Sequence, residues 1–120
     1  MEAVSLAPSF DGITEHWRPR VAASFNGQDI KLVKFCGEFV WHQHDETDEV
    51  FLVWRGSFRI EFRDRTVTLG PGDLVVVPRG VEHRPVADEE VEVLLLEAVE
   101  TRNTGNVVDD RLTAPSGVTI

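Results

Sequence analysis

The stretch GEFVWHQHDETDE, at residues 37–49, decides how this chain is interpreted. Alternate residues of an extended strand point to the same face, so a His-x-His pair sends two imidazoles into one space. His42 and His44 form such a pair. Glu49 follows a short polar turn and opens the apolar run 50–54, from which its carboxylate can return to the same space. The stretch therefore predicts a polar site built from two histidines and a glutamate.

A second stretch, GDLVVVPRGVEH at residues 72–83, supplies a third histidine. His83 stands just after a Pro-x-Gly turn and can close the site from a neighbouring strand. Neutral imidazole and carboxylate ligands suit iron, manganese, nickel, copper, cobalt or zinc. The two stretches together predict a site for one divalent transition-metal ion, with the ligands His42, His44, Glu49 and His83.

Other charged residues near these stretches have simpler interpretations. Asp45, Glu46 and Asp48 stand in the turn before Glu49, where we expect them to be solvated; Asp48 is also placed to orient a ligand histidine through a hydrogen bond. Arg59 and Glu61 alternate with apolar residues, which indicates a salt-paired outer face.

The two stretches resemble the two sequence motifs of the cupin superfamily. The first motif is carried here by Gly37, His42, His44, Glu49 and Gly56, and the second by Gly72, Pro78, Gly80 and His83. Two departures are visible: the gap between Gly37 and His42 is one residue shorter than is usual in the family, and Ala87 stands where the second motif ends in Asn. Neither departure removes a metal ligand.

The resemblance is to small single-domain bacterial cupins, loosely similar to mannose-6-phosphate isomerase-like cupins. It implies an all-β fold, a double-stranded β-helix or jelly-roll barrel, and a metal ion held by the same four residues. It does not name a reaction, because one fold hosts many functions.

Length and charge limit the possible partners. A chain of 120 residues predicts one domain, residues 1–120. A net charge of −9 argues against nucleic-acid and anionic-membrane partners. The chain has no run of ~20 apolar residues and no signal-peptide pattern, and its one cysteine, Cys36, cannot form an internal disulfide. These features favour a cytoplasmic protein.

Short β-prone runs separated by Gly and Pro turns predict an all-β sandwich or barrel. The expected strands are residues 20–25, 29–35, 39–44, 50–54, 58–62, 66–69, 74–77 and 91–99, with 74–77 in the core and 88–90 in a polar turn. Asp11 is placed to cap a short helical turn at residues 15–17. The tail, residues 101–120, is expected to be ordered only by packing on the barrel or on a partner subunit, and we expect a homodimer.

Several functions stay open at this point. The leading hypothesis is a metal-dependent cupin that acts on a small polar organic molecule by oxygenation or isomerisation. The alternatives are a non-catalytic small-ligand binding or sensor module with a structural metal, and a sugar-phosphate isomerase-like enzyme. The last needs basic groups in the pocket, for which the sequence offers Lys31, Lys34, Arg59 and Arg84. An apolar pocket would favour an oxygenase, and a filled barrel would favour a structural metal.

Overall fold

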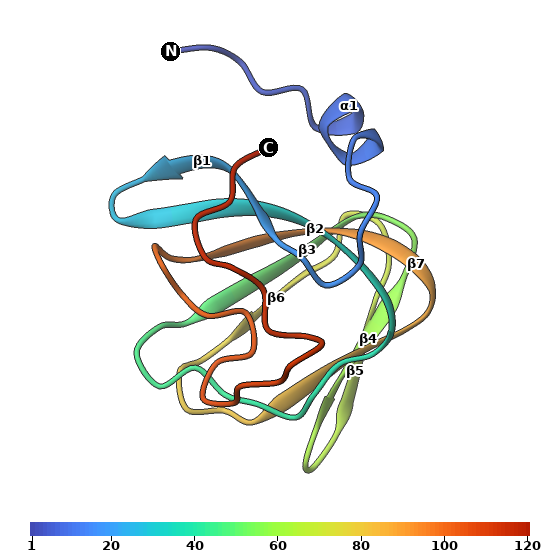
Figure 1. The fold of residues 1–120 in the computed structure, drawn as a ribbon. Helices are drawn as coiled ribbons and strands as arrows, with labels where there is room; N and C mark the ends of the chain where they lie inside the picture. The colour runs from blue at the N-terminus through green and yellow to red at the C-terminus, as the bar shows by residue number, and fades with distance from the viewer.

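A seven-stranded antiparallel sheet, curved around an apolar interior, forms the body of the molecule (Figure 1). The computed structural model describes residues 1–120. Its elements are α1 (Leu6–Asp11), β1 (Arg20–Phe25), β2 (Gln28–Glu38), β3 (Glu49–Arg55), β4 (Phe58–Phe62), β5 (Thr66–Leu69), β6 (Leu74–Val77) and β7 (His83–Ala98). No helix has the length and apolar character needed to cross a bilayer.

The long strand β7 joins the layers of the sheet. It pairs with β2 along one edge, from Val86 to Ala98. On its other edge, its first residues pair with β4 and its later residues pair with β3. Because β7 pairs with both β4 and β3, it joins these two strands into one sheet that closes around a common interior.

The turn between β1 and β2 has the geometry that its sequence predicts. Asn26 and Gly27 have φ values of 49° and 74°, and Phe25 pairs with Gln28. A two-residue hairpin turn of this kind needs positive φ at both central positions, which Asn and Gly adopt most easily. The predicted hairpin is confirmed.

Alternation along the central strands produces two apolar clusters. Val91, Val93 and Leu95 of β7 point inward, into a cluster that also contains the aromatic residues of β2, β3 and β4. Leu94 points outward, where it packs with Leu32 and with residues of the N-terminal segment that includes α1. The sheet is therefore apolar on both faces, and the N-terminal segment covers part of the outer face.

Several predicted elements are wrong. Residues 39–44 are not a strand, since only His42 makes an isolated bridge, to His83. The helix lies at Leu6–Asp11, and residues 15–17 form a bend in which Trp17 has a φ of 62°. Residues 88–90 belong to β7 and are not a turn.

The strand at 74–77 forms, but only one of its faces lies in the core: Val77 is buried in the inner apolar cluster and Val75 packs against that cluster. β6 is an edge strand that pairs only with β3, and Leu74 and Val76 expose 61% and 51% of their surface. An apolar edge strand looks like a core strand in sequence, because the pattern does not show that one neighbour is missing.

The tail packs on the barrel of its own chain. Thr104, Leu112 and Ala114 are buried, and Thr119 makes a parallel bridge to Val21 of β1. Figure 1 shows the red C-terminal segment crossing the sheet and ending beside β1. The tail was expected to be ordered by packing on the barrel or on a partner subunit, and the structure shows packing on the barrel.

Candidate metal site

Three parts of the chain supply the four predicted ligand residues. His42 and His44 lie in the loop between β2 and β3, Glu49 is the first residue of β3, and His83 is the first residue of β7. Two backbone hydrogen bonds join the loop to β7: the N–H of His42 donates to the carbonyl of His83 at 3.0 Å, and the N–H of His83 donates to the carbonyl of His42 at 2.9 Å. This bridge replaces the strand that the His-x-His pattern predicted, and it still brings the imidazoles together.

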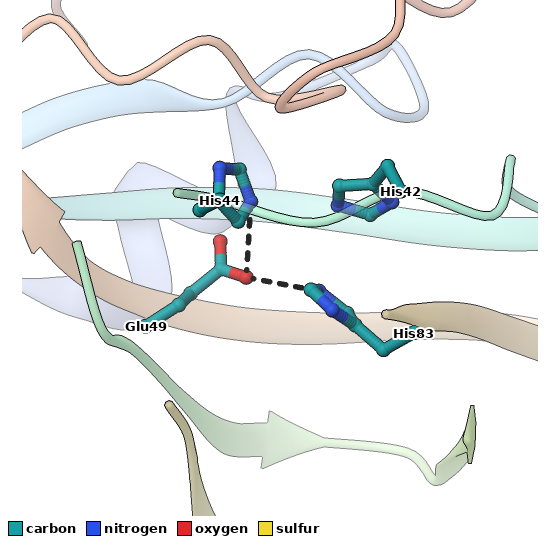
Figure 2. Close-up of side chains that lie close together, drawn as sticks. All are labelled: His42, His44, Glu49 and His83. Atoms are coloured by element: carbon teal, nitrogen blue, oxygen red, sulfur yellow. Dashed lines mark ion pairs between the residues drawn. The ribbon is translucent and has the colours of Figure 1, made fainter. Parts of the chain in front are cut away.

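The four side chains point into one space (Figure 2). One ligand atom from each lies within 4.8 Å of the others, and all four residues are buried. Oε1 of Glu49 lies 3.4 Å from Nε2 of His44 and 3.4 Å from Nε2 of His83. Bonds of ~2.1 Å to one ion would place ligand atoms ~3.0–4.2 Å apart, so a small contraction would allow all four to bind it.

Backbone carbonyls fix two of the imidazoles. Nδ1 of His42 lies 2.9 Å from the carbonyl oxygen of Val40, and Nδ1 of His83 lies 2.9 Å from that of Val81. A carbonyl only accepts hydrogen bonds, so Nδ1 carries the proton and Nε2 presents its lone pair to the site.

Asp48 does not take the orienting role that the sequence suggested. Its carboxylate accepts hydrogen bonds from the backbone N–H of Arg79 at 2.9 Å and from Nε of Arg79 at 3.2 Å. The residues that orient the imidazoles contribute main-chain atoms, so no side-chain pattern in the sequence could identify them.

Burial changes the electrostatics of the site. Burial, followed by the nearby His83, lowers the pKa of His42 to about 4. Burial alone would raise the pKa of Glu49, but its contacts with His44 and His83 outweigh this effect and hold that pKa well below its usual range. An ionised carboxylate beside a neutral imidazole is the state that a metal ion requires.

A second buried carboxylate stands behind Glu49. Glu97 is fully buried, and its Oε1 lies 3.0 Å from Nζ of Lys31, which is also buried. Burial and the charge of Glu49 raise the pKa of Glu97 well above its usual range. Two carboxylates therefore share a buried space with one ammonium group. Glu97 was not identified from the sequence, where it stands in the apolar strand run 91–99.

The tail holds the loop that carries the two histidines. The N–H of Gln43 donates to Oδ1 of Asn106 at 2.9 Å, and the N–H of Asn106 donates to the carbonyl of Gln43 at 3.0 Å. Gly105 packs against the same peptide, and a Cβ there would overlap the Gln43 carbonyl and lie 3.2 Å from Cδ2 of His42. The turn residues Gly105 and Asn106 were the only sequence signal for this contact.

A small apolar cavity adjoins His42 and Glu49. Its volume is about 20 Å³, which holds roughly one water molecule. Its apolar wall consists of Trp17, Val33, Phe35, Phe39, Phe51 and Leu95. No lysine or arginine lines it.

The basic residues suggested for a phosphate pocket have other partners. Arg59 and Arg84 pair with Glu61, and Arg59 also pairs with Asp88, so the salt-paired face is confirmed. Lys34 lies 3.8 Å from Glu90 and 3.9 Å from Glu92. Lys31 is held by Glu97.

Comparisons with known proteins agree with this architecture. The Cupin domain family model matches residues 34–99, which is more than half of the chain. A crystal structure of a cupin-2 domain containing protein from Shewanella frigidimarina is 46% identical, covers 79% of this chain and 93% of that chain, and has a TM-score of 0.78. A crystal structure of a protein from Neisseria meningitidis is 31% identical, covers 81% of this chain and 99% of that chain, and has a TM-score of 0.75. The chain belongs to the cupin family, which confirms both the resemblance and the expected all-β fold class.

The name of a curated relative does not indicate an activity. The chain is 38% identical over 60 residues to the uncharacterized protein YdbB of Bacillus subtilis, a match that covers 49% of this chain and 53% of the relative. The chain thus spans about half the length of the curated relative it matches.

Proposed function

We propose that this chain binds one divalent transition-metal ion through His42, His44, Glu49 and His83, and uses it to hold a small polar organic molecule. The observation that carries the proposal is a set of buried polar atoms without a hydrogen-bond partner: Nε2 of His44, Nε2 of His83 and Oε1 of Glu49. Buried polar atoms are nearly always paired, because an unpaired one costs free energy. A cation between these atoms would satisfy all three.

The charge of the buried cluster supports the same conclusion. Glu49 and Glu97 carry two carboxylates into the interior, and Lys31 brings one ammonium group. The raised pKa of Glu97 shows that the site disfavours a second buried negative charge, so ionisation of both carboxylates would require a further cation nearby. A divalent ion would be such a cation.

The cavity favours an organic ligand that carries no phosphate group over a sugar phosphate. Its wall is apolar and contains no basic side chain, which weakens the sugar-phosphate isomerase alternative. A metal ion held by His42, His44, Glu49 and His83 would supply Lewis-acid chemistry, and a redox-active ion would supply oxidation chemistry as well. Oxygenation or isomerisation of a small polar molecule is the corresponding reaction class.

A non-catalytic binding or sensor module is the second candidate. The small volume of the cavity favours the form of this candidate in which the metal is structural, because about 20 Å³ does not hold an organic molecule in the conformation seen here. Turnover separates the two candidates: a binding module retains its ligand unchanged, whereas an enzyme converts it.

We further propose that residues 1–120 form a single cytoplasmic domain that works as a homodimer without nucleic-acid or membrane partners. The net charge of −9 and the lone free cysteine support this proposal.

Metal analysis of protein purified without chelator or nickel resin tests the proposed function. We expect about one first-row transition-metal ion per chain in the wild type and a small fraction of that in His44→Ala. Equal, substoichiometric metal in the two proteins would contradict the proposal. The identity of the ion then decides whether dioxygen uptake or isomerisation is assayed first.

A further inference from the structure

Trp17 fills the space next to the metal-site cavity. Its indole ring is stacked between two phenyl rings, with centroid distances of 4.5 Å to Phe35 and 4.6 Å to Phe39. Phe39 in turn meets the imidazole of His42 at 5.2 Å, edge to face. The indole also forms part of the cavity wall. The indole therefore occupies the apolar space that the cavity would have to gain in order to hold an organic ligand.

The backbone of Trp17 is in a conformation that few residues adopt. Its φ of 62° lies in the left-handed region, which is uncommon for a bulky residue without a local reason. The residue belongs to a bend in the segment between α1 and β1, not to a helix or a strand. The chain thus accepts backbone strain in order to place this side chain between the two rings.

A few hydrogen bonds hold Trp17 in place. Its N–H donates to the carbonyl of Lys34 at 2.8 Å, and its indole Nε1–H donates to the carbonyl of Cys36 at 2.9 Å. Its own carbonyl accepts from Nδ2 of Asn103 at 3.2 Å. The tail and the irregular N-terminal segment therefore meet at this residue, and no strand ladder has to break for it to move.

We propose that the Trp17 side chain occupies the place of a ligand ring, and that a planar organic anion binds by displacing it from between Phe35 and Phe39. The ring of the ligand lies between the two phenyl groups, and its carboxylate or phenolate points toward His42 and Glu49, where a cation would receive it. This deepens the proposed function, on which the role of the anionic end rests. The spacing of the phenyl rings admits one flat ring, so a puckered ring of equal charge binds less tightly.

The probe for this proposal is benzoate, and the reporter is Trp17 itself. Trp41→Phe with Trp54→Phe leaves Trp17 as the only tryptophan. We expect saturable addition of benzoate to zinc-loaded protein to shift the Trp17 emission to longer wavelength and to increase its quenching by acrylamide. Cyclohexanecarboxylate, which has the same charge and a puckered ring, should do so at about tenfold higher concentration or above. Unchanged Trp17 emission at saturating benzoate would overturn the proposal.

Removal of the indole provides the second test. Trp17→Ala should bind benzoate at least about tenfold more tightly than the wild type, because the ligand no longer has to displace the side chain. Trp17→Phe, which keeps an aromatic ring in the core, serves if the alanine variant does not fold, and it should show a smaller gain. Trp54→Ala, at a half-exposed tryptophan on the outer face of β3, is the matched control and should bind like the wild type. Equal benzoate affinity in the wild type and the Trp17 variants would contradict the proposal.

The two proposals fail in different ways. If zinc binds at the four residues but benzoate neither moves Trp17 nor gains affinity in Trp17→Ala, the displacement proposal is wrong and the metal site stands. If benzoate displaces Trp17 equally well in zinc-loaded and metal-free protein, the ring site stands and the role given to the cation in ligand binding is wrong.

Discussion

At the scale of single residues, His42 contributes to the pH dependence expected of the metal-free protein. Burial and His83 lower its pKa from 6.5 to about 4. The unfolded chain therefore takes up a proton near pH 6.5, whereas the folded chain stays neutral at this residue until about pH 4. Stability is lost as the pH falls through this window, by up to about 3 kcal/mol in the free energy of unfolding.

Urea denaturation of metal-free wild type and His42→Gln, between about pH 7 and pH 4, measures this effect. The stability of the variant should depend less on pH. Glu97 acts in the opposite direction, since its raised pKa gives stability that is present at low pH and lost as the pH rises. Because Glu97 is present in both proteins, the comparison isolates His42. Parallel pH profiles would show that His42 is not the group responsible.

At the scale of elements, the contact between the tail and the histidine loop can be broken at one residue. Gly105 has a φ of 55°, and a Cβ there would overlap the carbonyl of Gln43. Gly105→Ala should therefore displace the loop and weaken zinc binding, with a cost of roughly 1–3 kcal/mol. Gly117→Ala is the matched control, since its φ of 73° imposes similar strain but no atom lies within 4 Å of its Cβ. Equal zinc affinity in the two variants would contradict a positioning role for the tail.

Asn106 tests the same contact without backbone strain. Asn106→Ala removes the acceptor of the Gln43 N–H but keeps the backbone hydrogen bond to the Gln43 carbonyl. We expect zinc affinity to fall about fivefold, the equivalent of one hydrogen bond of about 1 kcal/mol. Isothermal titration calorimetry measures it, and an unchanged affinity would show that the backbone hydrogen bond is sufficient.

The elements also show which features could be predicted from the sequence. The Asn26-Gly27 hairpin and the alternating strand 58–62 are local patterns, and both were predicted correctly. The burial of β6 depends on which strand lies beside it, and the bend at Trp17 depends on the rings that receive its indole. Neither neighbour is visible in a local pattern, so the exposed face of β6 and the bend at Trp17 were both missed for the same physical reason.

The candidate site was predictable to a different extent. The spacing of His42, His44, Glu49 and His83 in the sequence was sufficient to predict that these four side chains meet. In the structure, one ligand atom from each lies within 4.8 Å of the others. The groups around them were not predictable, because main-chain carbonyls, the buried Glu97 and the turn residue Asn106 carry no motif.

At the scale of the whole molecule, the outer face of the sheet predicts self-association. Leu74 and Val76 of the edge strand β6 are exposed, and their neighbours Val50 and Leu52 on β3 are apolar as well. An exposed apolar edge strand is usually covered by another chain or element. Val76→Lys should therefore convert a homodimer into a monomer in sedimentation at micromolar concentration.

The matched control for the dimer is Val108→Lys, at an exposed valine in the tail. It adds the same charge to the surface and should leave the dimer intact. A wild-type sedimentation mass of one chain would show that the apolar edge has no partner of this kind.

The most direct test of the central claim is a zinc titration of metal-free protein at about pH 7.5 and about pH 5.5. Wild type should bind one ion per chain, and its affinity should be lower at the lower pH, because metal ligation needs neutral imidazoles and releases protons. His42, whose pKa is about 4, is neutral at both pH values and should contribute little to this difference. His44→Ala should weaken binding by roughly a hundredfold or more. His16→Ala, whose imidazole pairs with Glu90 at the surface, should bind like the wild type. An affinity that is equal at both pH values and unchanged in His44→Ala would contradict the assignment of these residues as metal ligands.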